Sequence, residues 1–192
     1  MNPIEIIGFA AGSLGISLGI PQALQIRRLG HGEGVSRLAW VLIFAMNCAW
    51  ASYGIRLGSP STLVTNSLYA LVTASVVVSL FGSTKKSLPL LLAILLVVGG
   101  LILNLPTLLV SIFLTASVFS QLPQVKQSLE NLKQRKPSAV SLNTLYITAV
   151  SVTLWGTYGA LHHYYLMILT SSIALVMTLL IIRLEKRIIS SL

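Results

Sequence analysis

The sequence predicts an all-α integral membrane protein, with seven transmembrane helices arranged as two parallel three-helix bundles joined by a linker helix. Three observations lead to this fold class: an apolar composition, a series of apolar runs of spanning length, and an internal repeat. Of the 192 residues, 55% are hydrophobic and 9% are charged, whereas a soluble domain carries about 25% charged residues. Such a chain cannot cover its surface with charge, so we expect a lipid bilayer around it.

Seven apolar runs follow one another along the chain, each close to the ~17–25 residues that a helix needs to cross a bilayer. Lipid offers no partner for a bare amide, and the alternating ten-residue pattern of a membrane barrel is not visible, so helices are expected. The predicted spans cover residues 4–26, 37–57, 59–82, 87–104, 105–127, 139–161 and 164–183.

The net charge of +9 comes from basic residues that gather on one side of the predicted spans. Arg56 alone falls on the other side. Clustering of this kind follows the positive-inside rule and predicts a multi-pass cell-membrane protein, with its N-terminus outside and its C-terminus cytoplasmic. The same placement argues against nucleic acid as a partner. The clustered residues are Arg27, Arg28, Arg37, Lys85, Lys86, Lys126, Lys133, Arg135, Lys136, Arg183, Lys186 and Arg187.

The chain repeats the same motifs in the same order. A Pro-Gln pair near the end of the first span returns 102 positions later, and a Val-Ser pair and a Trp-x-x-Tyr-Gly motif return 105 positions later. A duplicated membrane unit usually places two half-bundles across a substrate path. The matching motifs are Pro21-Gln22 with Pro123-Gln124, Val35-Ser36 with Val140-Ser141, and Trp50 to Gly54 with Trp155 to Gly159.

The repeat divides the chain into two triple-helix bundles, residues 1–86 and 105–192, and a linker helix over residues 87–104. A unit with an odd number of spans ends on the opposite side of the membrane from where it began. One additional helix restores the orientation of the second copy, so the two bundles are expected to be parallel repeats.

The two prolines of the repeat are candidate hinges. A proline inside a helix removes one backbone hydrogen bond and clashes with the carbonyl four residues earlier. Pro123 should therefore free the Phe119 carbonyl, and Pro21 the carbonyl four residues before it. Two prolines at matching positions, followed by Gln22 and Gln124, favour paired hinges near the cytoplasmic mouth. A static kink is the alternative.

A second constellation predicts a binding pocket near the bilayer midplane. Trp50 and Asn66 lie eight residues to either side of Gly58, the expected outer turn of a helical hairpin, and Trp155 and Ser171 take the same places in the second copy. Each pair should therefore lie roughly 12 Å below the outer turn. An indole can pack on the apolar face of a sugar while amide or hydroxyl groups meet its hydroxyls. For Asn66, an interhelical hydrogen bond is the alternative.

Two further features are expected to serve packing and anchoring. Gly8, Gly12, Gly15 and Gly19 share one face of the first helix, where small residues let helices approach closely. Trp40 lies near the cytoplasmic end of its helix, where a tryptophan usually anchors at the membrane interface.

The acidic residues all fall at segment ends or in loops, at Glu5, Glu33, Glu130 and Glu185. Proton-coupled carriers usually place a carboxylate or histidine within the membrane, so we expect passive, bidirectional transport without a buried titratable group. No nucleophile–base pair stands within the spans, which argues against an enzyme. The single cysteine, Cys48, excludes a cysteine-built metal site, and no metal or cofactor is expected.

On these residues the chain resembles the PQ-loop superfamily and, within it, the SWEET and SemiSWEET sugar transporters, over nearly its whole length. The resemblance implies a facilitative uniporter of mono- or disaccharides that works by alternating access. It implies sugar-binding roles for Trp50, Asn66 and Trp155. It also implies extracellular gating by Tyr53, Arg56 and Tyr158, and bending of the Pro21 and Pro123 regions at the inner gate.

The resemblance leaves some points open. Ser171 stands where the second bundle would carry the counterpart of Asn66, so the expected pocket is asymmetric. A PQ-loop carrier of another solute, such as an amino acid, is one alternative, although this midplane offers no charged partners for one. A sorting receptor on the same fold is the other, and it would need Arg or Lys in the cavity. Association into a homo-oligomer stays open.

Overall fold

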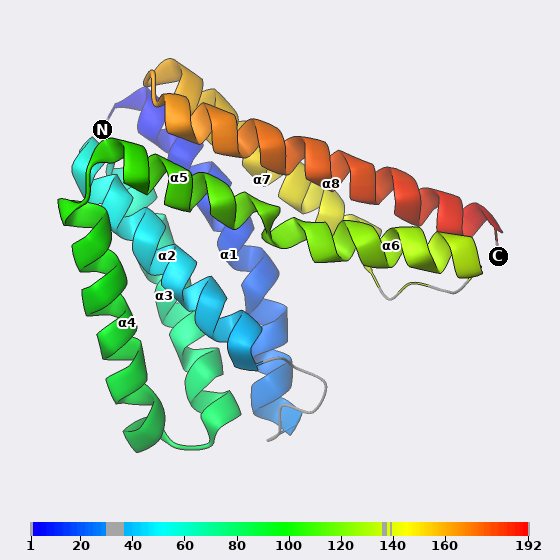
Figure 1. Ribbon diagram of the computed structural model, residues 1–192, viewed down its shortest axis with the longest axis horizontal. Helices are drawn as coiled ribbons and strands as arrows, with labels where there is room; N and C mark the ends of the chain where they lie inside the picture. Colours follow the sequence, from blue (N-terminus) through cyan, green and yellow to red (C-terminus); the bar gives the residue numbers. More distant parts are fainter. Residues whose placement is uncertain (1, 30–36, 136–137, 139, 192) are drawn as a thin grey trace. The chain divides into compact units, whose positions relative to one another are not determined.

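The computed structural model describes residues 2–29, 37–135, 138 and 140–191, and the regular secondary structure in these residues is helical throughout. Glu33, Val35, Ser36 and Lys136 lie outside them. The segments α5, η1 and α6 follow one another without a gap, so this part of the chain holds seven helical segments (Figure 1). The elements are α1 (Pro3–Leu29), α2 (Arg37–Leu57), α3 (Pro60–Phe81), α4 (Thr84–Asn104), α5 (Thr107–Val118), the 3₁₀ turn η1 (Phe119–Gln121), α6 (Leu122–Gln134), α7 (Leu142–Leu161) and α8 (Tyr165–Ser191).

Five of these segments are long and apolar enough to cross a membrane, and they fit a protein embedded in one. They are Arg37–Leu57, Pro60–Phe81, Thr84–Asn104, Thr107–Gln134 and Tyr165–Ser190. The helix α7 has 20 residues, but the polar and small side chains distributed along it lower its hydropathy. In α1, which runs from Pro3 to Leu29, the stretch with continuously described side chains is Pro3–Leu18, and it is apolar. The seven-span topology and its 3+1+3 order therefore remain predictions.

The first compact unit comprises Met1–Val110 and includes α4. Within it, α3 packs against both α1 and α2, and α4 packs against α2 and α3. Trp40 is 8% exposed and packs in the apolar core of this unit with Phe44, Val77 and Leu91. The expectation of an interfacial anchor at Trp40 is therefore wrong, because its indole is enclosed by side chains of its own unit instead of facing the interface.

The helices α1 and α3 approach so closely that one crossing point requires glycine. A Cβ atom added at Gly12 would overlap the side chain of Thr65. Gly8 is also buried. The glycine stripe predicted to serve helix packing thus does so at Gly12, where the missing side chain lets the two backbones meet.

The turn between α2 and α3 closes with paired backbone hydrogen bonds. Gly58 has φ +62°, and the Ser59 N–H donates to the Gly54 carbonyl at 2.9 Å. This left-handed closing turn is a common way to end a helix, and glycine adopts it at no steric cost. A Cβ atom at Gly54 would lie 2.6 Å from the backbone nitrogen of Leu63, so the hairpin is tight.

The second compact unit, Ser111–Leu192, repeats this hairpin 105 positions later. The Tyr164 N–H donates to the Gly159 carbonyl at 2.8 Å, and the left-handed residue is His163, with φ 58°. A Cβ atom at Gly159 would lie 3.1 Å from Met167 Cβ, so α7 and α8 also approach closely. The α2–α3 and α7–α8 turns therefore share one backbone design, as the sequence repeat predicts.

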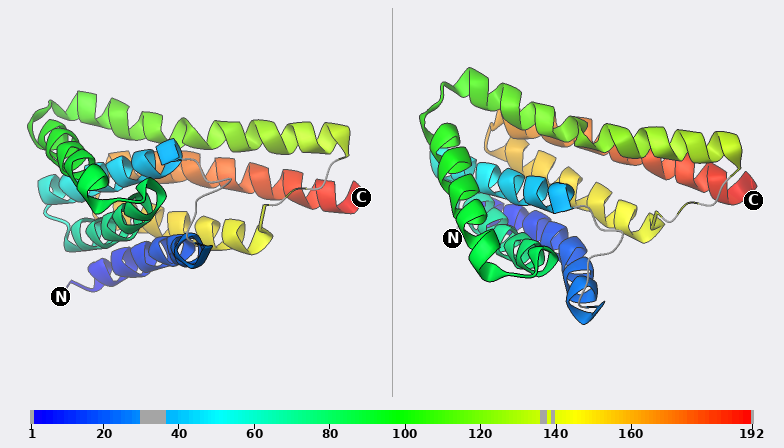
Figure 2. Two further views of the ribbon diagram at one scale, coloured as in Figure 1. Left: turned by 90° about the horizontal axis from the view of Figure 1, so that it is seen from below. Right: turned by 60° about the horizontal axis from the view of Figure 1, so that its bottom comes forward.

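In the second unit, α8 packs against both α6 and α7, and α6 and α8 run side by side (Figure 2). Val125, Ile181 and Leu184 form a shared apolar cluster. Both α6 and α8 extend beyond the ends predicted at 127 and 183, to Gln134 and Ser191. The extension of α6 is amphipathic, and one-sided packing on α8 stabilises it outside the apolar stretch.

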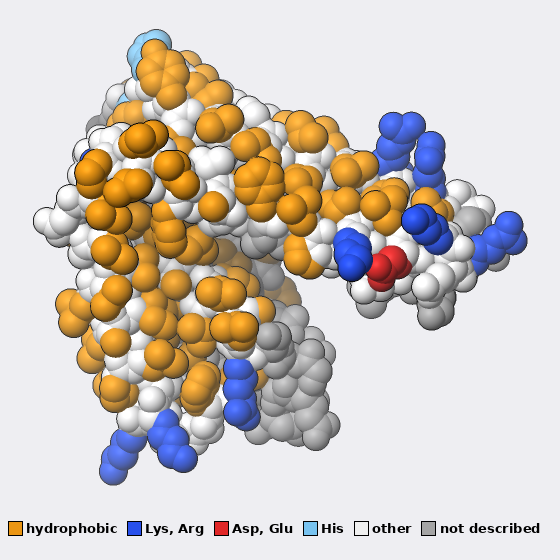
Figure 3. Space-filling view, viewed as in Figure 1, with side chains coloured by type: hydrophobic (Ala, Val, Ile, Leu, Met, Phe, Trp, Pro, Cys, Tyr) orange, Lys and Arg blue, Asp and Glu red, His pale blue; other side chains and the backbone are white. Residues whose placement is uncertain are grey.

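Basic side chains gather at one end of each unit, and hydrophobic ones cover much of the rest of the visible face (Figure 3). In the first unit, Arg37 and Lys85 mark the basic end, and the Arg37 guanidinium lies 5.7 Å from the centre of the Phe81 ring. Arg56 lies in the last turn of α2, at the other end of that helix. Within each unit the basic residues thus gather at one end (Figure 3), and the one-sided charge across the membrane and the orientation stay predictions.

Candidate functional site

Each unit holds a tryptophan against a tyrosine in the same geometry. The rings of Trp50 and Tyr53 meet edge to face at 5.8 Å and 82°, and those of Trp155 and Tyr158 at 5.7 Å and 87°. The two tyrosines are buried and the two tryptophans half-buried. Because the buried tyrosine fixes one side of each indole, the remaining ring surface is held in place rather than free to turn.

Asn66 stands on α3, the partner helix of the same hairpin. Its Nδ2 donates to the Thr62 carbonyl at 2.8 Å, one turn earlier in α3, so this bond lies within the helix and not between helices. The side chain is half-buried. A carboxamide has a second N–H and an acceptor oxygen beyond this bond, and these are the groups that could meet a ligand hydroxyl.

Ser171 takes the place of Asn66 in the second unit and is more enclosed. It is buried on α8, and a Cβ atom added at Gly156 would lie 3.4 Å from Ser171 Cβ. The α7 backbone therefore passes within ordinary contact distance of this position. The asymmetry of the expected pocket stays a prediction.

Arg56, expected near an outer gate, is bound to the end of α4. Its guanidinium donates to the carbonyls of Ile102 and Leu105, both at 2.8 Å, and to Thr107 Oγ1 at 2.9 Å. The last carbonyls of a helix have no partner within it and carry the negative end of its dipole. Arg56 thus fastens α2 to the turn after α4, and any gating role would require these three bonds to break.

The α7–α8 turn of the second unit carries an aromatic cluster that the α2–α3 turn does not have. His162 and Tyr164 stack at 5.0 Å and 8°, and Tyr158 lies 4.7 Å from the His162 ring. The positions matching His162 and Tyr164 in the first unit are Leu57 and Ser59. Tyr158 is therefore built into a packed turn, and no motif in the sequence predicted that stacking.

The two prolines act differently on their helices. Before Pro123 the α-helix changes into the turn η1, and the Leu122 N–H donates to the Phe119 carbonyl. This is the carbonyl that Pro123 cannot bond, so the predicted local effect is present, and a 3₁₀ bond satisfies the oxygen. By contrast, α1 continues as one α-helix through Pro21. The Gln22 side chain lies outside the described part of the structure.

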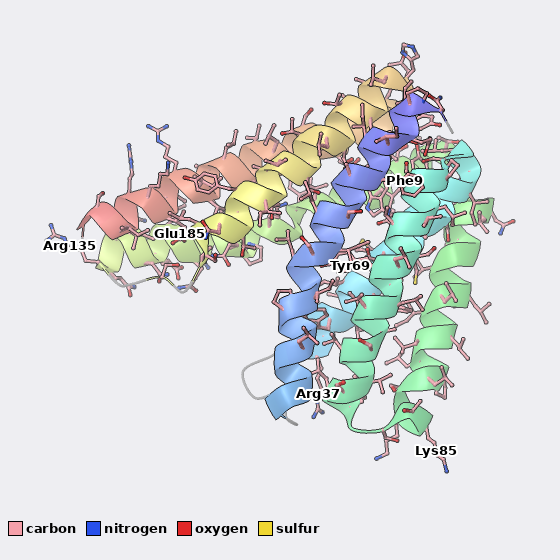
Figure 4. All side chains as sticks on the ribbon, turned by 180° about the vertical axis from the view of Figure 1, so that it is seen from behind. Phe9, Arg37, Tyr69, Lys85, Arg135 and Glu185 are labelled. Carbon is pink, nitrogen blue, oxygen red and sulfur yellow. The ribbon has the colours of Figure 1, made fainter. Side chains whose placement is uncertain are left out.

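A buried carboxylate lies beside the second Pro-Gln pair. Glu185 on α8 is 1% exposed, and its Oε1 accepts a hydrogen bond from Ser128 Oγ on α6 at 2.5 Å (Figure 4). Gln124 Nε2 in turn donates to Ser128 Oγ at 3.3 Å. Among the described residues, the one ion pair joins Lys126 to Glu130.

A second buried carboxylate lies at the start of α1. Glu5 is 5% exposed, and its Oε2 accepts the Ser61 N–H at 2.8 Å. This amide belongs to the first turn of α3, where backbone N–H groups attract negative charge. Glu5 thus joins α1 to the N-terminus of α3.

The expectation that the chain lacks a buried titratable group is therefore wrong, although the acids do lie near helix ends. Glu185 stands 20 residues beyond the start of α8, about 30 Å along the helix. The sequence contained a pattern that indicates the burial of Glu185. Ile181, Glu185 and Ile188 follow helical spacing on a stripe that is otherwise apolar and buried.

Within the residues that the structure describes, no group of three or more His, Cys, Asp or Glu side chains could hold a metal ion. Cys48 is buried in the core of the first unit. Comparison with protein-family models finds no match, and comparison with curated proteins finds none either.

Proposed function

We propose that the protein is a facilitative carrier of mono- or disaccharides in the cell membrane, of the PQ-loop superfamily and its SWEET and SemiSWEET branch. In this proposal, two parallel three-helix bundles joined by α4 alternate between outward-open and inward-open states. The N-terminus lies outside and the C-terminus in the cytoplasm. The chain is not an enzyme and uses no cofactor.

The observation that carries this proposal is the matched placement of aromatic and polar groups in the two units. Each unit holds a half-buried indole against a buried tyrosine with nearly the same ring geometry. Each α2–α3 or α7–α8 hairpin turns at the same repeat position, and this supports the proposed pairing of Trp50 with Asn66 and of Trp155 with Ser171. Flat apolar rings beside neutral hydrogen-bonding groups suit a sugar, which has C–H faces and hydroxyl edges.

The nature of the charged groups favours a neutral solute. Within the first unit, the guanidinium of Arg56 is occupied by carbonyls of the α4 end, so it is not positioned to receive a carboxylate. An amino acid or a peptide C-terminus would need such a cation. An amino-acid carrier and a sorting receptor therefore remain less favoured than a sugar carrier.

The test is counterflow of radiolabelled sugars in proteoliposomes, with a panel of mono- and disaccharides and of amino acids. Trp50→Ala and Asn66→Ala should each reduce sugar counterflow by about tenfold or more, because each removes a contact with the bound solute. Asn104→Ala is the matched control, because Asn104 Nδ2 makes the same within-helix bond, to the Gly100 carbonyl at 2.8 Å, on the exposed face of α4.

Two results would overturn the proposal. One is unchanged counterflow in both pocket variants when they are folded and reconstituted as well as the control. The other is accumulation of sugar above equilibrium when a proton gradient is imposed, which would replace a facilitative mechanism by a coupled one and direct attention to the buried carboxylates.

A further inference from the structure

In the second unit, the helical segment from α5 to α6 is interrupted at Phe119–Gln121, and we call this interruption the weak point. Between α5 and α6 the chain forms the 3₁₀ turn η1, and Pro123 is the second residue of α6, two positions after the end of η1. Bonds of the 3₁₀ type are poorer than α-helical ones, and a short 3₁₀ stretch inside a longer helix often marks a hinge. A bend at this point would move α6 relative to α8, against which it packs.

Few buried side chains attach the start of α6 to α8. Within α6, Val125 and Ser128 are buried, and the half-buried Leu132 packs on the same apolar cluster farther along the helix. Val125 packs with Ile181 and Leu184 of α8, and Ser128 donates to the Glu185 carboxylate. One apolar contact and one buried hydrogen bond thus hold the first two turns after the weak point.

The hydrogen bonds form a short chain that begins at the Pro-Gln pair itself. Gln124, the residue after Pro123, donates to Ser128 Oγ, and Ser128 Oγ donates to Glu185 Oε1. Ser128 and Glu185 are 0% and 1% exposed. Water therefore does not reach these groups to replace a lost hydrogen-bond partner. A buried polar group without a partner lowers the stability of the folded protein.

At the matching place in the first unit, the helix is continuous, and the sequence carries apolar residues where the second unit has Ser128 and Glu185. The positions matching Ser128 and Glu185 are Ile26 and Leu80, and Leu80 lies in the apolar core of its unit. There, α1 runs as one α-helix through Pro21. The broken helix and the buried hydrogen-bond chain therefore occur together, in one of the two repeats.

We propose that Ser128 and Glu185 are positioning residues for the bend at Pro123: their hydrogen bond latches the start of α6 to α8 and controls how readily the η1 segment opens. In the proposed carrier, on which this functional consequence rests, opening the latch accompanies the change of state on the second bundle. The latch would then set the turnover of transport and leave sugar affinity unchanged.

Hydrogen–deuterium exchange of the whole protein in lipid nanodiscs, at one pH and without sugar, tests the latch directly. Ser128→Ala should raise the exchange rate of amides between Phe119 and Lys126 by roughly tenfold, as expected for the loss of a buried hydrogen bond. Glu185→Gln keeps an acceptor oxygen and should give a smaller increase. Ser117→Ala is the matched control, because its hydroxyl donates only to the Leu114 carbonyl of the same helix.

Counterflow with the same variants provides the second readout. Ser128→Ala should change the maximal rate by several-fold with KM for the sugar unaltered, and Glu185→Gln should lie between it and the wild type. Unchanged exchange at the η1 segment in both Ser128→Ala and Glu185→Gln would overturn the latch. If exchange rises but the wild type moves no sugar, the latch stands and the proposed function fails. If sugar moves but exchange is unaltered, only the latch fails.

Discussion

The contact between Gly12 and Thr65 permits a quantitative test of how the first unit is packed. A Cβ atom at position 12 would overlap three atoms of the Thr65 side chain, and carbon atoms prefer separations of about 3.5–4.0 Å. In a Gly12→Ala variant, α1 and α3 must therefore move apart by roughly 1 Å or Thr65 must leave its rotamer. Overpacking of this kind typically costs about 1–3 kcal/mol.

The expected loss can be read as a lower midpoint of thermal unfolding, measured by size-exclusion chromatography after heating in detergent. For a chain of this size, about 1–3 kcal/mol corresponds to a decrease of roughly 2–12 °C. Gly100→Ala is the matched control, because nothing lies within 4 Å of a Cβ atom added there. Alanine is the better helix former by about 1 kcal/mol, so that variant should be as stable as the wild type or more so.

A double-mutant cycle isolates the contact. Thr65→Gly removes the atoms that would collide, so adding Gly12→Ala to it should cost at least about 1 kcal/mol less than adding Gly12→Ala to the wild type. Additive losses in the double variant, or an undiminished melting midpoint in Gly12→Ala alone, would refute the close crossing of α1 and α3.

Two further predictions concern the ends of helices. Arg56→Met removes three hydrogen bonds to the α4 end and should destabilise this half-buried site by about 1–2 kcal/mol. Limited proteolysis of the turn after Asn104 should therefore become faster. Arg37→Met is the control and should leave proteolysis at that turn unchanged. His163→Gly should raise the free energy of unfolding by roughly 1 kcal/mol, and with it the melting midpoint. Histidine holds φ 58° at a steric cost that glycine avoids. A fall in stability there would mean that the imidazole makes a compensating contact.

Local sequence signals predicted the α2–α3 and α7–α8 turns well. The positions eight residues from Trp50 and Trp155 do become the left-handed residues Gly58 and His163, since a helix end depends on hydrogen bonds within about five residues. The effect of Pro123 on the Phe119 carbonyl is local for the same reason. Such features need no knowledge of which helices meet.

Features that depend on contacts between helices were harder to read. Trp40 has the position of an interfacial anchor along its own helix, and packing with residues of α3 and α4 makes it a core residue. The position of Arg56 in the sequence predicts a residue at the opening of a transport path. Its hydrogen-bond partners lie at the end of α4, more than forty residues later in the chain. The burial of Glu185 likewise depends on Ser128, in a different helix.

The two repeats are alike where the chain itself dictates the geometry and differ where packing does. The α2–α3 and α7–α8 hairpins share turn position, backbone hydrogen bonds and the tryptophan–tyrosine geometry. At the proline ends, one unit has an intact helix and an apolar Leu80, and the other has a 3₁₀ break and a buried Glu185. If a carrier needs both bundles to rock equally, this difference is unexpected. If one bundle yields more readily than the other, the bend should be confined to the unit in which a breakable polar contact replaces apolar packing.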